Sequence, residues 1–461
     1  MNKESEIRRL TERLNTKKPP FYIFYLVMII CLVYITDELA SNICSQMKTE
    51  IANNLFSHFG DKSLGKLETL SLISYPCIAV SLFYRTLSDR LGRKPFLIIN
   101  TIGMALGMFT VFVSDGIPGY ILGYCIISFF VPHDMQVVYI MESAPAKHRA
   151  KIYSTVKAVA TLATMLIPLL RKTLMTSGSE WRKVFLIPAI IGFVSSFLAL
   201  LFASETNAFI ESKLKYLKMT PEEISAEKAS AKAARGGFFT SLKYAMKNAQ
   251  LRRLYLLMGF FDLGFIITSY YQVIFSYGYA QNMISASTAL SLSDALKFVE
   301  THQATKALFL FPVGSAFIQL ISGFLSDKTG RKPASVIMVA TTILSFIGFV
   351  CTSRFGLSPA LTGLLSGCCV GSFWAYGDIN VMMMSESSPT NLRASVLSSC
   401  YIISALGTFV GMGILIPLMN ILGNSVTTIA TVCISIPGML LSLFILAKTH
   451  ETRGTDLSTV E

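Results

Sequence analysis

Ionisable side chains are rare inside the long apolar stretches of this sequence, and most of them are acids. If those stretches cross a bilayer, each such side chain costs at least about 2.5 kcal/mol to insert, so each is expected to serve a purpose. A carboxylate in a low-dielectric cavity can also carry a proton near neutral pH, since burial favours its neutral form. His133 and Lys157 also lie in apolar stretches. Our candidates for binding a solute or a proton are Asp37, Glu38, Asp134, Asp262, Trp374 and Asp378.

Two of these acids hold equivalent positions in the chain. Asp134 and Asp378 follow the aromatic residues Phe130 and Trp374, respectively, by four positions. Residues four apart share a helix face, so each pair could attract a cation by charge and by cation–π contact. The alternative is that each carboxylate bonds a hydroxyl or backbone group of a neighbouring helix and only fixes packing.

The elements that carry these residues are apolar stretches of about 20 residues, the length needed to cross a bilayer. The chain is 52% hydrophobic and 15% charged, whereas soluble proteins are about 25% charged. Backbone groups inside lipid must bond to one another, so each stretch is predicted to be a helix. The sequence predicts an all-α membrane protein with twelve transmembrane helices, which begin near residues 21, 66, 96, 119, 152, 183, 254, 305, 334, 359, 394 and 426.

Two polar loop sequences each occur twice in the same order. SDRLGRKP at 88–95 returns as SDKTGRKP at 326–333, and ESAPAKHRA at 142–150 returns as ESSPTNLRA at 386–394. Two repeats at nearly one offset indicate a duplication, a common architecture among transporters. We therefore expect a six-helix half at 1–203, a basic cytoplasmic linker at 204–253 and a second six-helix half at 254–461 with a cytoplasmic tail.

The linker has a sequence typical of a helix start. Thr220 precedes Pro221 and the acids Glu222 and Glu223, an arrangement favoured at the first turn of a helix. An alanine- and lysine-rich run follows and ends at Gly236 and Gly237. This pattern favours a short amphipathic helix under the bundle over a disordered linker.

The repeated loops contain both acids and arginines. A loop that only connects two membrane spans does not need these charged residues. Gly92 and Gly330 would permit tight turns, and the charged residues could close one end of the molecule in one state and release it in another. The alternative is that basic residues such as Lys94 and Lys332 anchor to lipid headgroups. The predicted cytoplasmic gate comprises Asp89, Arg93, Glu142, Arg149, Asp327, Arg331, Glu386 and Arg393.

These loops resemble the signature of the major facilitator superfamily of transporters. The dipeptide WR at 181–182, SET at 204–206 and HETRG at 450–454 resemble landmarks of its sugar porter and organic cation transporter branch. That resemblance implies salt bridges that close the cytoplasmic side. The sequence departs from the pattern at Arg85, where glycine is usual. It also departs in the seventh span, YYQVIF at 270–275, and in the fourth span, which lacks the arginine of sugar–proton symporters.

The distribution of positive charge indicates orientation. With the N-terminus inside, 29 of the 40 Lys and Arg residues fall in inner segments, which is what the positive-inside rule expects. We expect a multi-pass protein of the plasma membrane with both termini in the cytoplasm and no removable signal peptide. We therefore interpret the net charge of +13 as a consequence of the orientation of the chain in the membrane. We expect no nucleic acid as a partner. The nine cysteines show no metal-site or disulfide spacing.

These features favour a secondary transporter that moves a small polar or cationic organic solute by alternating access, with protons as the coupling partner. No G-x-x-x-x-G-K-[ST] loop for ATP occurs. The alternatives are a sugar–proton symporter, a multidrug exporter, or a transporter-like nutrient receptor that binds without flux. We expect a monomer in the lipid bilayer, with no enzyme activity, no cofactor and no metal.

Overall fold

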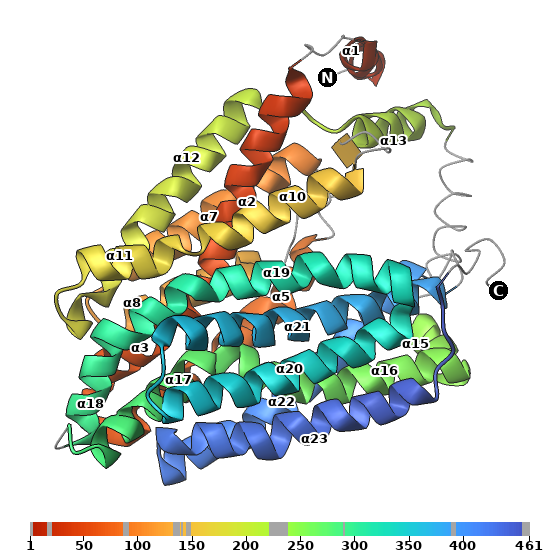
Figure 1. Cartoon of the computed structure of the whole chain (residues 1–461). Helices are drawn as coiled ribbons and strands as arrows, with labels where there is room; N and C mark the ends of the chain where they lie inside the picture. The colour runs from red at the N-terminus through yellow and green to blue at the C-terminus, as the bar shows by residue number, and fades with distance from the viewer. Residues whose placement is uncertain are drawn as a thin grey trace. The chain divides into compact units, whose positions relative to one another are not determined.

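The computed structural model shows a chain built from helices connected by short turns (Figure 1). No strand occurs among the residues that the structure describes, which are 3–15, 21–85, 92–131, 139, 142–143, 149–220, 238–288, 291–388 and 393–453. The chain forms two compact units, one from residues 1–47 and 67–227 and the other from residues 48–66 and 228–461. The second unit therefore includes a short segment from early in the chain.

The first unit holds the helices of the N-terminal half. Its core at one end is apolar and aromatic, with Val33, Phe96 and Tyr139 at most 1% exposed. The helices are α1 (Lys3–Asn15), α2 (Tyr22–Gln46), α5 (Ser74–Arg85), α7 (Arg93–Val113), α8 (Ile117–Phe130), α10 (Arg149–Ala163), α11 (Leu166–Leu174), η3 (Gly178–Phe185), α12 (Leu186–Phe202) and α13 (Asn207–Lys218). The residues of α4 (Ser63–Ser71) are divided between the two units after residue 66.

The second unit is built around α19, α20 and α21, which lie side by side in Figure 1. Its helices are α3 (Lys48–Leu55), η1 (Ser57–Lys62), α15 (Phe238–Lys247), α16 (Ala249–Phe261), η4 (Asp262–Gly264), α17 (Phe265–Ser285), α18 (Leu292–Phe298), η5 (Val299–Ala304), α19 (Thr305–Thr329), α20 (Arg331–Arg354), α21 (Pro359–Glu386), α22 (Arg393–Leu422), η6 (Asn424–Val426) and α23 (Thr427–Ala447).

The prediction of an all-α membrane protein with twelve spans in two halves is confirmed, since a helix or a broken helix occupies each predicted span. Within the described ranges, eight helices are long and apolar enough to cross a membrane by themselves. The second span breaks between α4 and α5, and the fifth breaks between α10 and α11. The fourth is described over α8, and the tenth is the 28-residue helix α21, which is rich in polar and small residues.

Glycines let α19 and α21 approach closely. A Cβ added at Gly363, Gly367 or Gly371 would collide with the α19 backbone at Ala307, Phe311 or Ser315. The three glycines are four residues apart, so they form one small-residue face of α21. Such faces drive helix association in membranes, where packing replaces the hydrophobic effect.

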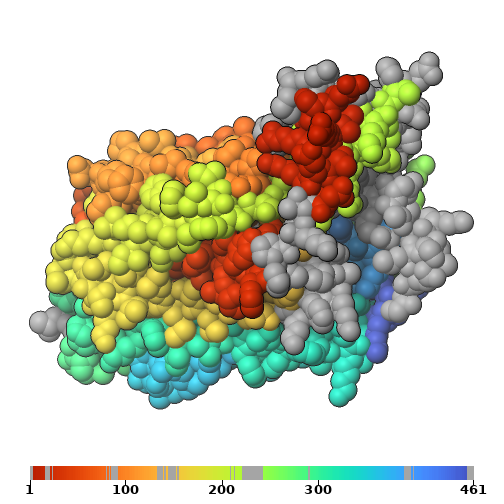
Figure 2. Space-filling view, turned by 90° about the horizontal axis from the view of Figure 1, so that it is seen from above, coloured from red at the N-terminus to blue at the C-terminus, as the bar shows by residue number. Residues whose placement is uncertain are grey.

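The predicted linker region contains two described helices. In the first unit, α13 packs beside α1, and Lys213 Nζ lies 2.7 Å from Glu6 Oε1. Figure 2 shows the red N-terminal helix next to the yellow-green α13. In the second unit, α15 precedes α16. The helix predicted to begin at Thr220 falls on residues 221–237, which lie outside the described residues, and the domain boundaries stay a prediction.

The two predicted glycine turns adopt matching left-handed conformations. Gly92 has φ 110° and ψ 165°, and Gly330 has φ 103° and ψ 165°. This region of backbone space is essentially restricted to glycine. A Cβ at Gly330 would also lie 2.9 Å from Glu451 Oε2, and one at Gly92 would clash with the Glu205 carboxylate. The turns need glycine both for their backbone and for their neighbours.

We expect Gly330→Ala to lower the free energy of unfolding by about 1–3 kcal/mol, the usual cost of such backbone strain. Thermal unfolding of the purified protein in detergent measures this change. Gly323→Ala is the matched control, because it lies within α19 and its added Cβ would meet nothing within 4 Å. The control should be neutral or more stable, since alanine is favoured over glycine inside helices. Equal stability of the two variants would contradict this account of the turn.

Candidate functional site

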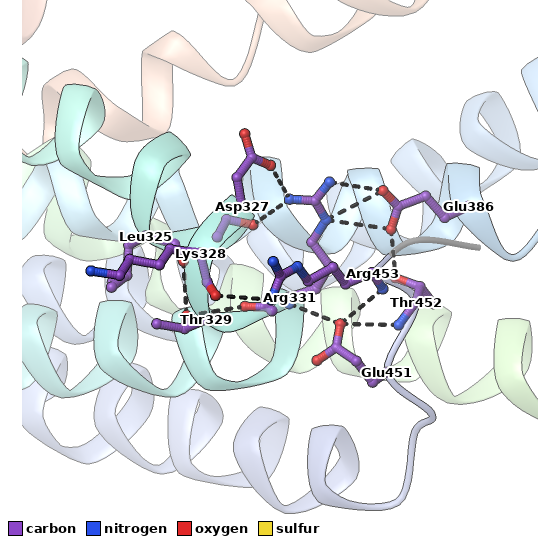
Figure 3. A network of polar contacts seen from close by, with 11 residues as sticks. Leu325, Asp327, Lys328, Thr329, Arg331, Glu386, Glu451, Thr452 and Arg453 are labelled. Atoms are coloured by element: carbon purple, nitrogen blue, oxygen red, sulfur yellow. Dashed lines mark hydrogen bonds and ion pairs between the residues drawn. The ribbon is translucent and has the colours of Figure 1, made fainter. Parts of the chain in front are cut away.

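A network of charged residues surrounds Arg331 at the start of α20 (Figure 3). The Arg331 guanidinium lies 3.0 Å from Glu386 Oε1 at the end of α21 and 2.8 Å from Asp327 Oδ1 at the end of α19. The side chains of Arg331 and Glu386 are only 13% and 18% exposed. The second copies of the two repeated loops therefore meet in space, as a charged cluster requires.

Two residues of the C-terminal tail complete this network. The Thr452 hydroxyl donates to Glu386 Oε2 at 2.6 Å. The Glu451 carboxylate accepts backbone N–H bonds from Arg331 at 2.8 Å and from Lys332 at 2.9 Å. Glu451 thus caps the first turn of α20, where a carboxylate satisfies free N–H groups and favours the helix dipole.

The first unit repeats this arrangement. Arg93 Nε donates to Glu142 Oε1 at 3.0 Å, and the Thr206 hydroxyl donates to Glu142 Oε2 at 2.6 Å. Glu205 accepts the backbone N–H groups of Arg93 at 2.9 Å and of Lys94 at 3.2 Å. Residues 205–206 therefore play the part that 451–452 play in the second unit. These four residues were not predicted to belong to the cluster, although their places after the sixth and twelfth spans were a usable signal.

The geometry locates five of the eight predicted gate side chains. Arg93 and Glu142 meet in the first unit, and Asp327, Arg331 and Glu386 meet in the second. Asp89 and the side chains of Arg149 and Arg393 lie outside the described residues. The observed ion pairs join the helices of one unit, where they fix the ends of the spans. The gating role of the cluster stays a prediction.

The Glu451 carboxylate gives this network a testable pH dependence. Partial burial raises the pKa of Glu451, but backbone N–H bonds from Lys332, Arg331, Arg453 and Thr452 outweigh it, so the pKa lies below the usual glutamate value. A lowered pKa means that the folded state favours the ionised form. Glu451 therefore contributes stability above the unfolded pKa of about 4.3, and this contribution is lost as the pH falls through the folded pKa.

We expect Glu451→Gln to lower the melting temperature at pH 7. The variant should also lose less stability than the wild type as the pH falls below about 5, since it lacks the group that titrates there. Melting curves of both proteins over that pH range check this expectation. Parallel curves at all pH values would show that Glu451 stabilises the loop without its charge.

The two candidate residues of the tenth span, Trp374 and Asp378, lie with Met382 on one solvent-exposed strip of α21. Trp374 is 45% exposed, Asp378 is exposed, and Met382 is 36% exposed. They are four residues apart on α21, and residues 375–377 and 379–380 between them are buried. The Trp374 ring also meets the ring of Phe265 edge to face, with centroids 6.3 Å apart. The strip thus presents an aromatic ring and a carboxylate on the same helix face.

Asp262 lies where the seventh span is interrupted. The 3-10 helix η4 separates α16 from α17 at this residue, and transporter sites are often formed at such breaks. Asp262 is 7% exposed, and its carboxylate accepts a hydrogen bond from the Ser404 hydroxyl on α22. This contact joins two helices of one unit. It agrees with the alternative to ligand binding, in which each carboxylate bonds a neighbouring helix and only fixes packing.

The remaining acids are in the first unit. Asp37 on α2 is 7% exposed, and the neighbouring Glu38 accepts a hydrogen bond from Asn42 Nδ2 at 3.2 Å. Asp134 and His133 lie outside the described residues. Among the described residues, four other buried charged residues were not predicted as candidates: Glu50, Glu68, Arg171 and Glu300. Of these, Glu68 falls within the second predicted span, so its position in the sequence could have identified it as a candidate. The other three flank predicted spans.

The described part of the chain contains no group of three or more His, Cys, Asp and Glu residues placed to hold a metal ion.

Comparisons with known proteins agree on one family and one fold. A family model of the Major Facilitator Superfamily matches residues 26–412. The D-xylose-proton symporter has a TM-score of 0.64 with 17% identity, covering 94% of this chain and 99% of its own. The inward open xylose transporter XylE from E. coli scores 0.63 with 17% identity and 95% and 99% coverage. A bacterial homolog of the human lysosomal transporter Spinster scores 0.56 with 15% identity and 94% and 96% coverage. No sequence match to a curated protein is found.

Proposed function

Because the chain belongs to the Major Facilitator Superfamily, we propose that it carries a small organic solute with a cationic group, coupled to protons. Membership of this family makes the chain a secondary transporter that works by alternating access. Family membership does not specify the solute class or the coupling ion. These two parts of the proposal depend on the side chains of this chain.

The strip on α21 carries the proposal. Asp378 is exposed near the middle of a membrane-spanning helix, eight residues or about 12 Å from its end at Glu386. A carboxylate that faced lipid there would cost at least about 2.5 kcal/mol, so the strip is better explained as the wall of a water-accessible path. Trp374 one turn away supplies an aromatic face for a cation, an interaction that strengthens where water is excluded.

Proton coupling is supported by the acidic character of the spans. Asp37, Glu38, Asp262 and Asp378 lie within membrane helices, against Lys157 as the main cation. A buried carboxylate that binds either a proton or a cationic solute, but not both at once, would couple transport of the solute to transport of the proton. The similar D-xylose-proton symporter shows that this fold supports proton coupling.

A sugar is the second candidate solute, because both xylose transporters resemble the chain over nearly its whole length. The aromatic run Tyr270–Tyr271 before Gln272 differs from the pattern of sugar porters, which favours the cation. The excess of Lys and Arg in one set of loops supports a plasma-membrane protein with both termini in the cytoplasm. A path within one chain supports a monomer.

Flux into reconstituted vesicles tests the proposal. The panel is radiolabelled amines, organic cations and sugars, each measured with and without an imposed pH gradient. Accumulation of an amine or organic cation driven by the gradient supports the proposal, and accumulation of a sugar instead would overturn the solute class. Binding to the purified protein without any flux would indicate a receptor.

A further inference from the structure

Two helices press against the interrupted seventh span at Asp262. A Cβ added at Gly407 of α22 would lie 2.1 Å from the Gly259 carbonyl oxygen and 3.2 Å from Asp262 Cβ. A Cβ added at Gly438 of α23 would lie 2.6 Å from the Phe260 carbonyl oxygen. Both helices therefore approach the backbone of this span closely, and Asp262 is buried where they meet it.

Two serines hold the two consecutive residues at the break. The Ser404 hydroxyl on α22 donates to the Asp262 carboxyl group. The Ser435 hydroxyl on α23 donates to the Leu263 carbonyl oxygen at 3.1 Å. A helix that is interrupted inside a bilayer leaves backbone groups that side chains must satisfy, and Ser435 meets that need. The two serines are thus matched positions, of which only Ser404 contacts an ionisable side chain.

Among the described residues, Ser404 is the hydrogen-bond partner of the Asp262 carboxyl group, and no Lys, Arg or His forms an ion pair with it. The thiol of Cys400 on α22 lies near the carboxyl group. The other titratable or charged groups on the helices packed around the break are Arg252, Arg253 and Tyr255 of α16, Tyr270, Tyr271, Tyr277 and Tyr279 of α17, Cys368, Cys369, Tyr376, Asp378 and Glu386 of α21, Arg393 and Tyr401 of α22, and Cys433 of α23.

The pair of Asp262 and Ser404 is suited to hold a proton. An ionised carboxylate is costly to bury without a cation, because one hydroxyl replaces only part of its hydration. The protonated carboxyl group gains a donor, so it can both donate to and accept from the Ser404 hydroxyl. Loss of the proton leaves a charge that these contacts do not neutralise. The break must then shift to bring water or another donor to the carboxylate.

The residues around Asp262 pack directly against α21 at the exposed strip. The Phe261 ring stacks on the Phe373 ring with centroids 4.1 Å apart. The Phe265 ring meets the Trp374 ring edge to face at 6.3 Å. Phe261 comes directly before Asp262 and Phe265 follows it by three residues. A shift of the break is therefore passed to Trp374 through these rings.

We infer that Asp262 binds the coupling proton, and that gain or loss of this proton moves Phe265 against Trp374 and so changes the affinity of the strip for the solute. Asp262 is a positioning residue with respect to the solute, which Trp374 and Asp378 contact. By linkage, the bound solute must change the proton affinity of Asp262 by the same factor. This inference rests on the proposed proton coupling, and it assigns the proton and the solute to different carboxyl groups.

Tryptophan fluorescence tests this link without a solute. Trp181 and Trp374 are the two tryptophans of the chain, so Trp181→Phe leaves Trp374 as the only one that emits. Asp378→Asn is included in this parent protein, because Asp378 lies one turn from Trp374 and could titrate in place of Asp262. We expect one pH-dependent step in the emission, and Asp262→Asn should abolish it. No step, or a step that survives Asp262→Asn, would overturn the inference.

The two serines provide matched controls for this step. Ser404→Ala removes the hydroxyl bonded to the carboxyl group and should shift the midpoint of the step, whereas Ser435→Ala should leave the midpoint unchanged. Infrared difference spectra between acidic and alkaline pH follow the same proton in the chain with both tryptophans, and Asp262→Asn should reduce the band of the protonated carboxyl group. An equal response to both serine substitutions, or an unchanged infrared band, would contradict the assignment.

Transport assays separate the roles of the two carboxyl groups. With the solute that the vesicle panel identifies, Asp262→Asn should lose far more of the accumulation driven by a pH gradient than of the solute exchange at equal pH. Asp378→Asn should lose both activities alike. Equal losses of both activities in Asp262→Asn, or no loss, would overturn the inference. If the fluorescence step is present but no solute is driven by the gradient, the proposed coupling fails while the link from Asp262 to Trp374 stands.

Discussion

Replacing Arg331 by glutamine should destabilise the protein by about 3 kcal/mol and abolish transport. The Arg331 and Glu386 side chains are 13% and 18% exposed, so their ion pair is largely shielded from water. Removal of one partner from such a pair leaves a charge that is poorly solvated, at a cost of about 3–5 kcal/mol for fully buried pairs. Thermal or chemical unfolding in detergent measures the change.

Two comparisons show whether the ion pair is the cause. Lys328→Gln removes a neighbouring exposed cation and should leave stability unchanged. The double variant Arg331→Gln with Glu386→Gln should lose less stability than the sum of the single variants, because neither charge is then left alone. Strictly additive losses would show that the two side chains act independently and would contradict the network.

Asp378→Asn should reduce transport of a cationic solute by about 10- to 150-fold, the loss of a charged hydrogen bond worth about 1.5–3 kcal/mol. The isosteric amide keeps the shape of the exposed strip on α21 and removes its charge. Trp374→Leu should cost about tenfold, since a partly desolvated cation–π contact contributes about 1–2 kcal/mol. Initial uptake rates in vesicles, normalised to the amount of reconstituted protein, measure both effects.

Met382→Leu is the matched control for these two variants. Met382 lies one turn beyond Asp378 on the same strip, and the exchange conserves volume without touching charge. It should transport as the wild type does. If Asp378→Asn also transports normally, the carboxylate is structural and the proposed solute site on α21 is wrong.

Much of the fold could be predicted from the sequence, because membrane spans are set by local composition. A run of about 20 apolar residues has few alternatives to a helix in lipid. The predicted start at residue 359 coincides with the start of α21, and the predicted starts at 96 and 334 are each three residues from those of α7 and α20. The breaks within the second and fifth spans were not predicted, since tertiary packing rather than composition determines them.

The candidate site was predictable only where its residues repeat. The loops that contain Arg93 and Arg331 stood out by their duplication, and the structure brings each arginine to the glutamate of the other repeated loop in the same unit. The capping roles of Glu205 and Glu451 depend on where the chain returns after the sixth and twelfth spans. The contacts of residues 48–66 could not be predicted either, because their partners Tyr277, Glu300 and Asn424 are more than 200 residues away along the chain.

Proton-coupled transport of a cationic solute is tested by uptake of the panel into vesicles with an imposed pH gradient, before and after addition of a protonophore. We expect gradient-driven accumulation of an amine or organic cation that the protonophore abolishes and that Asp378→Asn lacks. Accumulation that persists unchanged with the protonophore would contradict proton coupling, and accumulation of a sugar alone, undiminished in Asp378→Asn, would contradict the cationic solute site.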